Sequence, residues 1–392
     1  MKLSITDPLR IISVKNMKIL YTASSLSLNN GGPTQSIYNT VKGLRASEFG
    51  VDILTYQPNS SDKLISTEDF IITLPKGKTS FLYSLDYKHY LKDHSCDLYH
   101  AQGVWQYPTC ISAKIARKQN KPYIITPRGT LYPQALNISR QKKQIFLKCF
   151  LLNDLNKAAA VHATCAEEMK HLRNLGVKSP IAVIPNPINV TTNFPISTSH
   201  SQLKVGYLGR VHPRKNIERI IYAWEKLGSK VADKELVIIG EGDEQYFQFL
   251  KKEVFRLRLK NVVFTGFLSG VAKESTLNSL SYLVVPSNFE NFGMIVLEAL
   301  IKGIPVIASL GTPWEELNTH RCGWWVNNDI DTLAETIEKA IDTPEFVRIE
   351  MGKRGQELIK NNYSVEVVAE KMTRLYNWIL NGGEKPDFVY VD

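Results

Sequence analysis

Short apolar runs alternate with helical patterns along the whole chain. In the first half, runs of strand length occupy residues 17–23, 51–56, 97–103, 122–129, 158–165 and 181–189. Residues 29–47 turn on two glycines and then place Ile37, Val41 and Leu44 at helical spacing. Strands that alternate with helices predict a parallel α/β sheet.

A second alternating series follows a polar break at residues 191–202, which we interpret as a linker rich in Ser, Thr and Asn. Its strand-like runs are 203–210, 234–242, 261–267, 281–287, 304–309 and 323–328. Two such halves predict two facing Rossmann-like domains, 17–190 and 203–365. A last amphipathic helix, 366–383, is expected to pack across both, and residues 1–16 to form an N-terminal tail.

Composition is that of an ordinary globular protein. The 392 residues are 43% hydrophobic and 22% charged. No apolar run reaches the roughly 18 residues of a membrane-spanning helix, and the start lacks the apolar core of a signal peptide. The five cysteines are scattered, with no C-x-x-C and no zinc-ligand spacing. We therefore expect reduced thiols and a cytoplasmic protein.

The net charge of +10 is concentrated in one window. From Leu98 to Asn153 there is no Asp or Glu, and the cations there are Lys114, Arg117, Lys118, Lys121, Arg128, Arg140, Lys142, Lys143 and Lys148. Such a window is either a solvated basic face or a surface that meets anionic lipid or phosphate. It lacks regularly interleaved aromatic residues and any nucleic-acid motif, so we expect no nucleic-acid partner.

Two elements of the second half carry candidate chemistry. "GRVHPRKN" follows a strand and places Arg210 and Lys215 beyond its carboxyl end, where they could bind phosphate. "ENFGMIVLE" brackets a helix start near Phe292 with Glu290 and Glu298. About 12 Å of helix would separate the two acids. Each could accept hydrogen bonds from one polyol, and a diphosphate between the two polyols could bind the free N–H groups at the helix start. The alternative is a dipole-complementing acid plus a structural Glu.

These elements, in this order, resemble the retaining GT-B glycosyltransferases of family 4. "NFENFGMIVLEALIKGIPVIAS" is similar to the family's paired-glutamate signature, "GRVHPRKN" to its Gly-Arg-x4-Lys element and "IIGEGDE" to its glycine turn. "NVVFTGF" resembles its strand and turn near the nucleotide base, and "NNGGPTQSIYNTVKGL" its first glycine-rich turn and helix. The resemblance covers about residues 17–380.

The resemblance implies roles for individual residues. Glu290 would contact the donor hexose and Glu298 the ribose, while Arg210 and Lys215 would neutralise the diphosphate. Backbone N–H groups at the helix start and several glycines would approach the donor: Asn291, Phe292, Gly293, Gly31, Gly32, Gly209 and Gly266. The donor would be a UDP- or GDP-sugar. No cofactor is implied, and we expect no metal.

Three further motifs, "HAQGVW", "TPRGTL" and "GTPWEELNTHRCGWWV", resemble the branch that builds bacterial surface polysaccharides, including lipopolysaccharide. The resemblance implies a lipid-linked saccharide acceptor and peripheral contact with an anionic membrane. The run "SRQKKQIFLKCFLL", residues 139–152, suggests an interfacial helix in which Arg140, Lys142, Lys143 and Lys148 face lipid. The alternative is a helix that buries its apolar residues in its own domain.

The chain departs from the family at two places. Where many relatives have His-x-His, it has His100, Ala101 and Gln102, so a general base at Gln102 is in doubt. His100 is either a substrate contact or a packed strand-end residue. Pro187 stands where relatives often have Gly, and Asn186 is expected to be structural, as His162 is. Rival functions are a sugar-nucleotide epimerase on the same fold and an inactive sugar-nucleotide or membrane-surface binding protein.

Overall fold

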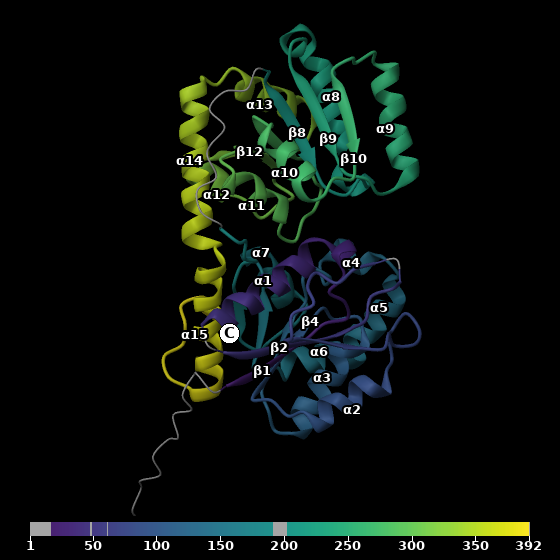
Figure 1. Ribbon diagram of the computed structural model, residues 1–392, viewed down its shortest axis with the longest axis vertical. Helices are drawn as coiled ribbons and strands as arrows, with labels where there is room; N and C mark the ends of the chain where they lie inside the picture. Colours follow the sequence, from purple (N-terminus) through teal and green to yellow (C-terminus); the bar gives the residue numbers. More distant parts are fainter. Residues whose placement is uncertain (1–16, 48, 61, 191–201, 392) are drawn as a thin grey trace, which may run out of the picture. The chain divides into compact units, whose positions relative to one another are not determined.

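The computed structural model describes residues 17–47, 49–60, 62–190 and 202–391. The chain forms two compact domains, which are treated separately below (Figure 1). The first domain extends to Pro187 and resumes at Val365, and the second comprises Ile188–Ser364. The expected tail, and all of the expected linker except Gln202, lie outside the described residues.

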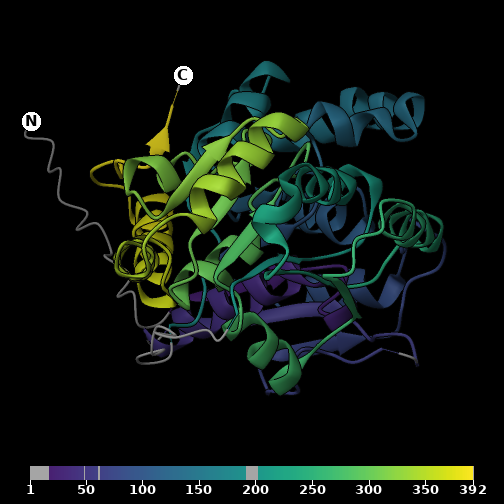
Figure 2. The ribbon, with the colours of Figure 1, turned by 90° about the horizontal axis from the view of Figure 1, so that it is seen from above.

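The first domain is built on an eight-stranded sheet. Its strands, in spatial order, are β14 (Val389–Tyr390), β7 (Ile181–Val183), β6 (Ala160–Ala163), β5 (Tyr123–Thr126), β4 (Leu98–Gln102), β1 (Lys18–Thr22), β2 (Gly50–Tyr56) and β3 (Ile71–Leu74). All neighbours pair in parallel except β14, the short yellow arrow beside the C-terminus in Figure 2, which pairs antiparallel to β7. The central strands are buried on both faces, which explains their continuous apolar sequence.

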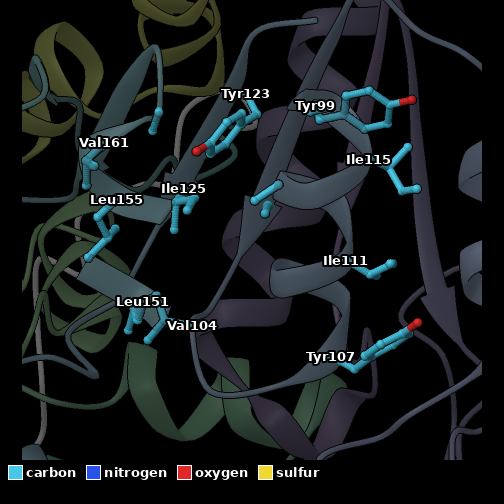
Figure 3. Close-up of a cluster of buried hydrophobic side chains, with 14 of the residues drawn as sticks. Tyr99, Val104, Tyr107, Ile111, Ile115, Tyr123, Ile125, Leu151, Leu155 and Val161 are labelled. Carbon is cyan, nitrogen blue, oxygen red and sulfur yellow. The ribbon is translucent and has the colours of Figure 1, made fainter. Parts of the chain in front are cut away.

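Helices cover both faces of this sheet. One face carries α1 (Gly32–Ala46) and α15 (Val365–Asn381), whose apolar sides share one core. The other face carries α2 (Leu85–Asp93), α3 (Tyr107–Lys118), α4 (Pro133–Asn137), α5 (Arg140–Phe146), a π-helical turn (Leu147–Leu151), α6 (Leu152–Asn156) and α7 (Ala166–Asn174). Figure 3 shows Ile111 and Ile115 of α3 in this core together with Leu151, Leu155 and Val161.

The second domain has a six-stranded sheet whose neighbouring strands all pair in parallel. The spatial order is β10 (Val262–Gly266), β9 (Glu235–Ile239), β8 (Lys204–Leu208), β11 (Tyr282–Val285), β12 (Val306–Ser309) and β13 (Gly323–Val326). One face is covered by α8 (Ile217–Leu227), α9 (Glu244–Arg256) and α13 (Ile330–Ile341). The other is covered by α10 (Gly270–Asn278), α11 (Met294–Ile301), α12 (Glu316–Thr319) and α14 (Glu345–Asn362).

The prediction of two Rossmann-like α/β domains with parallel sheets is confirmed, with differences at the edges. The short edge strands β3 and β14 were not predicted, because neither has a long apolar run. The helix predicted at 366–383 is α15, and its buried residues belong to the core of the first domain. That it also packs across the second domain stays a prediction.

Candidate functional site

The strand order marks one point on each sheet where a ligand is expected. In the second sheet the chain proceeds outward from β8 to β10 on one side and from β11 to β13 on the other. In the first sheet it proceeds from β1 to β3 on one side and from β4 to β7 on the other. Ligands of open α/β sheets bind at the carboxyl ends of the strands at such a reversal. The loops after β8, β11, β1 and β4 are therefore the places to examine.

The loops after β8 and β11 are joined by an ion pair between Lys215 and Glu290. Both side chains are nearly buried, at 11% and 13% exposure. Ser287 also donates to the Glu290 carboxylate, at 3.1 Å. Burial, with a smaller contribution from Arg214, lowers the pKa of Lys215 to about 7. The Glu290 carboxylate opposes this shift because it favours the charged amine.

Asparagine side chains hold these two loops in place. Asn216, in the left-handed region at φ 52°, donates to the carbonyl of Pro286 at 3.0 Å. Asn288 donates to Asn216, and Asn328, which follows β13, donates to both Pro286 and Asn288. Because these bonds cross three loops, they fix Lys215 and Glu290 relative to each other.

Further positive charge lies on the loop after β8. Arg210 and Arg214 are exposed, and neither guanidinium pairs with an acid among the residues that the structure describes. Arg210 follows Gly209, and its stem passes 3.0 Å from where a Cβ on Gly242 would lie. Gly240 has φ 134°, and a Cβ there would meet the Gly209 carbonyl at 2.0 Å. Only glycine allows these turns to approach so closely.

The turn before α11 differs from the prediction. The helix begins at Met294, two residues after the expected start at Phe292, because Gly293 has φ 81° and forms the N-cap. The Trp314 indole donates to the carbonyl of Phe292 at 2.5 Å and packs against its ring. Asn291, Phe292 and Gly293 therefore form a loop fixed by Trp314, and the first helical N–H groups that lack an intrahelical partner begin at Met294.

Glu298 lies on α11 and pairs with Lys273 of α10 at 2.6 Å. Both side chains are about a quarter exposed, so the pair is open to solvent. Gly266, at the carboxyl end of β10, has φ 72° and is followed by Phe267, which is 64% exposed. The second domain thus brings together on one sheet edge the predicted residues Arg210, Lys215, Glu290 and Gly209, with Glu298 on α11 and Gly266 on the outermost strand.

In the first domain, the loop after β1 ends in the predicted glycine turn. Gly31 is the N-cap of α1 at φ 61°, and no heavy atom lies within 4 Å of where its Cβ would be. Gly32 is the first residue of the helix. Backbone at this helix start is therefore open to a close approach by a ligand.

His100 does not reach this edge as a substrate contact. Its side chain is fully buried, with Nδ1 2.9 Å from Tyr376 Oη and Nε2 2.7 Å from Thr126 Oγ1. Burial, the neighbouring His162 and Arg128 hold its pKa well below the usual value. These contacts favour the alternative of a packed strand-end residue, and a catalytic role of His100 stays a prediction.

The His100 contacts belong to a chain of hydrogen bonds whose direction is fixed. The carbonyl of Ile184 can only accept, so His162 Nε2 donates to it at 2.8 Å. His162 Nδ1 then accepts from Thr126, which accepts from His100, which accepts from Tyr376. Both imidazoles are neutral, and burial lowers the pKa of His162 to about 3. The expectation of a structural His162 agrees with these contacts.

Gln102, at the end of β4, contacts a cation that the sequence analysis did not assign to the site. Arg128 Nε donates to Gln102 Oε1 at 2.9 Å. Arg128 Nη1 lies 3.3 Å from Ser36 Oγ and 3.2 Å from Asn186 Oδ1, and Ser36 donates to Asn186 at 2.6 Å. The sequence signal for Arg128 is its position two residues after a strand, in "TPRG". The sequence analysis identifies Arg128 only as one cation of the basic window.

The segment 138–151 is half buried. Ile138, Ile145 and Phe150 are 69%, 64% and 60% exposed, and Arg140, Lys142 and Lys148 beside them are exposed. Leu147 and Leu151 are buried, and Phe146 packs against the core. Lys143 donates to the carbonyl of Ala135 and lies over the Trp105 ring, so it is a structural contact rather than a free cation.

Two features are absent from the described residues. No group of three or more His, Cys, Asp or Glu side chains in that part of the chain could hold a metal ion. No helix there is both long enough and apolar enough to cross a membrane.

The fold and the two sheet edges define a two-domain protein of the GT-B type, and solved structures match it over almost the whole chain. Sucrose-phosphate synthase from Thermosynechococcus elongatus superposes with a TM-score of 0.75 at 20% identity, covering 94% of this chain and 100% of that one. HepE from Anabaena, in complex with UDP and glucose, superposes with a TM-score of 0.70 at 18% identity, covering 92% and 99%.

Sequence comparison gives the family. Residues 30–192 match the Glycosyltransferase Family 4 model, and residues 191–375 match the model of glycosyl transferases group 1. The chain therefore contains one glycosyltransferase domain of each kind.

Two curated relatives illustrate how far the similarity extends. The capsular polysaccharide biosynthesis glycosyltransferase CapM of Staphylococcus aureus is 28% identical over 46% of this chain. That match spans only 47% of CapM, about half its length. The uncharacterized glycosyltransferase MJ1178 of Methanocaldococcus jannaschii is 25% identical over 84% of this chain and 90% of its own length.

Proposed function

We propose that this protein transfers a hexose, with retention of configuration, from a nucleotide-diphosphate sugar to a saccharide acceptor. The observation that carries the proposal is the Lys215–Glu290 pair at the strand-order reversal of the second domain. A buried amine and carboxylate in contact, beside the exposed Arg210 and Arg214, offer both a cation for a diphosphate and an acceptor for sugar hydroxyls.

The chemistry assigned to this edge is stabilisation of a leaving group. The bond between the sugar C1 and the diphosphate oxygen breaks, and an acceptor hydroxyl oxygen bonds to C1 on the same face. The hydroxyl proton passes to the departing phosphate. Arg210 and Lys215 neutralise the charge that develops on the diphosphate, with help from the first N–H groups of α11. No side chain is required as a general base, which fits Gln102.

Glu290 accepts hydrogen bonds from the hexose in this proposal, and Glu298 from the ribose. The ribose would either share the Glu298 carboxylate with Lys273 or displace Lys273 from it. Both are feasible because about a quarter of each side chain is exposed to solvent. Gly266 leaves room for the base, and the exposed Phe267 provides an apolar surface beside it. The expected donor is a UDP- or GDP-sugar, and the expectation that no metal or cofactor takes part stays a prediction.

We further propose a role in surface-polysaccharide biosynthesis, with a lipid-linked acceptor at the cytoplasmic face of a membrane. Support comes from the half match to CapM and from the segment 138–151. Its three exposed apolar side chains lie among three exposed cations, in a window without acids, which complements an anionic lipid surface.

The proposal is tested with a panel of UDP-, GDP- and ADP-sugars. A true donor at a hundred times its dissociation constant stabilises the protein by about 2.7 kcal/mol, which a thermal shift detects. The stabilising sugar nucleotide should then release its nucleotide diphosphate when acceptor is supplied, with or without EDTA. If no sugar nucleotide stabilises the protein, the proposed activity is wrong.

A further inference from the structure

Arg128 is a cation whose hydrogen-bond partners are all neutral. Its guanidinium contacts Gln102, Ser36 and Asn186. Within the described residues, no carboxylate lies at ion-pair distance from it. The Arg128 side chain is half-buried, and a guanidinium withdrawn from solvent for a structural role alone is normally paired with an acid, because its charge must be compensated.

Glu168, the acid whose charge acts on Arg128, forms its hydrogen bonds with other groups. Glu168 accepts from the backbone N–H of Gly129 at 2.5 Å and from the N–H and hydroxyl of Thr164 at 2.8 Å and 2.9 Å. These bonds tie the loop after β5 to the end of β6, and they occupy both carboxylate oxygens. Burial accordingly lowers the pKa of Arg128 to about 10, with only partial compensation from Tyr21 and Glu168.

Gln102 provides a second, independent observation. The residue is 5% exposed, and its Nε2 is buried without a hydrogen-bond partner in the described structure. The amide cannot be reversed to relieve this, because its Oε1 accepts from Arg128 Nε. Both N–H donors of Gln102 Nε2 thus lack an acceptor among the described residues, next to the Arg128 guanidinium.

The position of these donors matches where a ligand is expected. Gln102 ends β4, one of the two strands that flank the order reversal of the first sheet, and Arg128 follows the adjacent β5. Unmet donors next to an uncompensated positive charge select an anionic oxygen over a neutral hydroxyl.

We propose that Arg128 and Gln102 bind a carboxylate or phosphate oxygen of the acceptor, so that the acceptor is an acidic or phosphorylated saccharide. This inference rests on the proposed glycosyl transfer. It assigns the anion to the acceptor because the cations suited to the donor diphosphate lie on the second domain.

The test compares three monosaccharides on the full-length protein by ligand-observed NMR: glucuronate, glucose 6-phosphate and glucose. At least one of the two anionic sugars should bind tenfold more tightly than glucose, and which one does so distinguishes a carboxylate from a phosphate. If all three bind equally, or if neither anionic sugar binds, the proposal is overturned.

The decisive variant is Gln102→Glu, which places a carboxylate beside the Arg128 guanidinium. It should abolish the preference for the anionic sugar while leaving the melting temperature equal or higher, because the cation gains an internal partner. Gln102→Met, which removes both the Nε2 donor and the Oε1 acceptor of Arg128 but adds no charge, should reduce the preference less. An anionic preference that survives in Gln102→Glu would show that Arg128 is merely structural.

Binding of UDP, measured on the same proteins, separates this inference from the proposed function. UDP should bind wild type and Gln102→Glu alike, because its proposed contacts lie on the second domain. Absence of UDP binding together with a retained anionic preference would contradict the glycosyl transfer alone. Arg128→Gln gives an independent check if it folds, and Gln102→Glu decides the question if it does not.

Discussion

Lys215 and Glu290 are 75 residues apart in sequence, yet they form an ion pair that joins the loops after β8 and β11. Their side chains are almost withdrawn from solvent, so each neutralises a charge that would otherwise be buried alone. Loss of either partner alone would therefore leave an unpaired buried charge, and in the proposed function the pair contributes to donor binding.

Lys215→Met should destabilise the second domain strongly, because it leaves the Glu290 carboxylate buried without a cation. Removing one member of a buried pair costs about 3–5 kcal/mol. The double variant Lys215→Met/Glu290→Gln should recover much of that loss, since no charge then remains unpaired. Urea unfolding measures both.

The matched control for this experiment is Lys226→Met, which breaks the exposed pair of Lys226 with Asp331. It should change stability by less than about 1 kcal/mol. Equal losses for Lys215→Met and Lys226→Met would contradict the importance of burial. Neither Lys215→Met nor the double variant should retain turnover, because a lost charge contact to the leaving group costs about 10²–10³ in rate.

Nucleotide binding should take up a proton above neutral pH. Burial lowers the pKa of Lys215 to about 7, so part of this amine is neutral at pH 8 in the free protein, a fraction that the Glu290 carboxylate reduces. A bound diphosphate favours the charged amine and raises that pKa. Calorimetric titration of UDP at pH 8, in two buffers of different ionisation enthalpy, should show net proton uptake of up to one proton, and donor affinity should fall as pH rises above 7.

Lys215→Arg is the control for the pH experiment, because arginine stays charged throughout this range. It should bind UDP with no proton uptake at pH 8. Wild-type uptake of zero would mean that Glu290 keeps Lys215 charged in the free protein. The lowered pKa of Lys215 also makes the stability of the fold depend on pH. Below pH 7 the charged lysine lowers the free energy of unfolding most, and this cost fades as pH rises toward 10.5.

Trp314→Phe should weaken donor binding severalfold. The indole N–H bond to the Phe292 carbonyl fixes the turn that precedes α11, and phenylalanine keeps the packing but loses the donor. The expected loss of stability is about 1–3 kcal/mol. Trp224→Phe also removes an indole bond, to Asn261, but on the other face of the same sheet, and it should leave UDP affinity unchanged.

Acid should destabilise the first domain through two neutral histidines. His100 and His162 have folded pKa values well below 6.5, so the unfolded chain binds more protons than the folded one below that pH. Stability is therefore lost as pH falls from about 6.5, at up to about 1.4 kcal/mol per pH unit for each histidine. Urea unfolding at pH 7 and pH 5 measures the loss, and His162→Gln should show a smaller pH dependence.

The segment 138–151 should bind anionic vesicles. Arg140, Lys142 and Lys148 are exposed beside Ile145 and Phe150, and each such cation is worth about 1 kcal/mol near an anionic surface. Wild type should float with anionic vesicles at low salt, less at high salt, and hardly with neutral ones. Lys143 is not counted among the lipid-facing cations, because its amine donates to the carbonyl of Ala135 and lies over the Trp105 ring.

Changing Arg140, Lys142 and Lys148 to serine should abolish flotation while UDP binding persists. The matched control changes Lys226, Lys230 and Lys353 of the second domain to serine. It lowers the net charge by the same amount as the first variant, and its positions are also exposed. If the two triple variants float alike, net charge rather than this segment governs binding.

The sequence by itself determined the two α/β domains, every central strand, and the residues that follow β8 and β11. Those features are local: apolar runs set strands, glycines set turns, and a residue that follows a parallel strand lies at the carboxyl edge of its sheet. The sequence could not assign α15 to the core of the first domain or predict β14 as an antiparallel edge, because both depend on packing against distant elements.

Only the tertiary structure decided which side chains meet. It places His100 in a buried chain of hydrogen bonds and pairs Glu298 with a lysine on α10. It also sets the start of α11 at Met294, and it puts Arg128 in contact with Gln102, whose buried Nε2 has no hydrogen-bond partner among the described residues. The physical reason is that hydrogen bonding and desolvation of a polar side chain depend on everything folded around it. Sequence spacing sets only the element on which that side chain is carried.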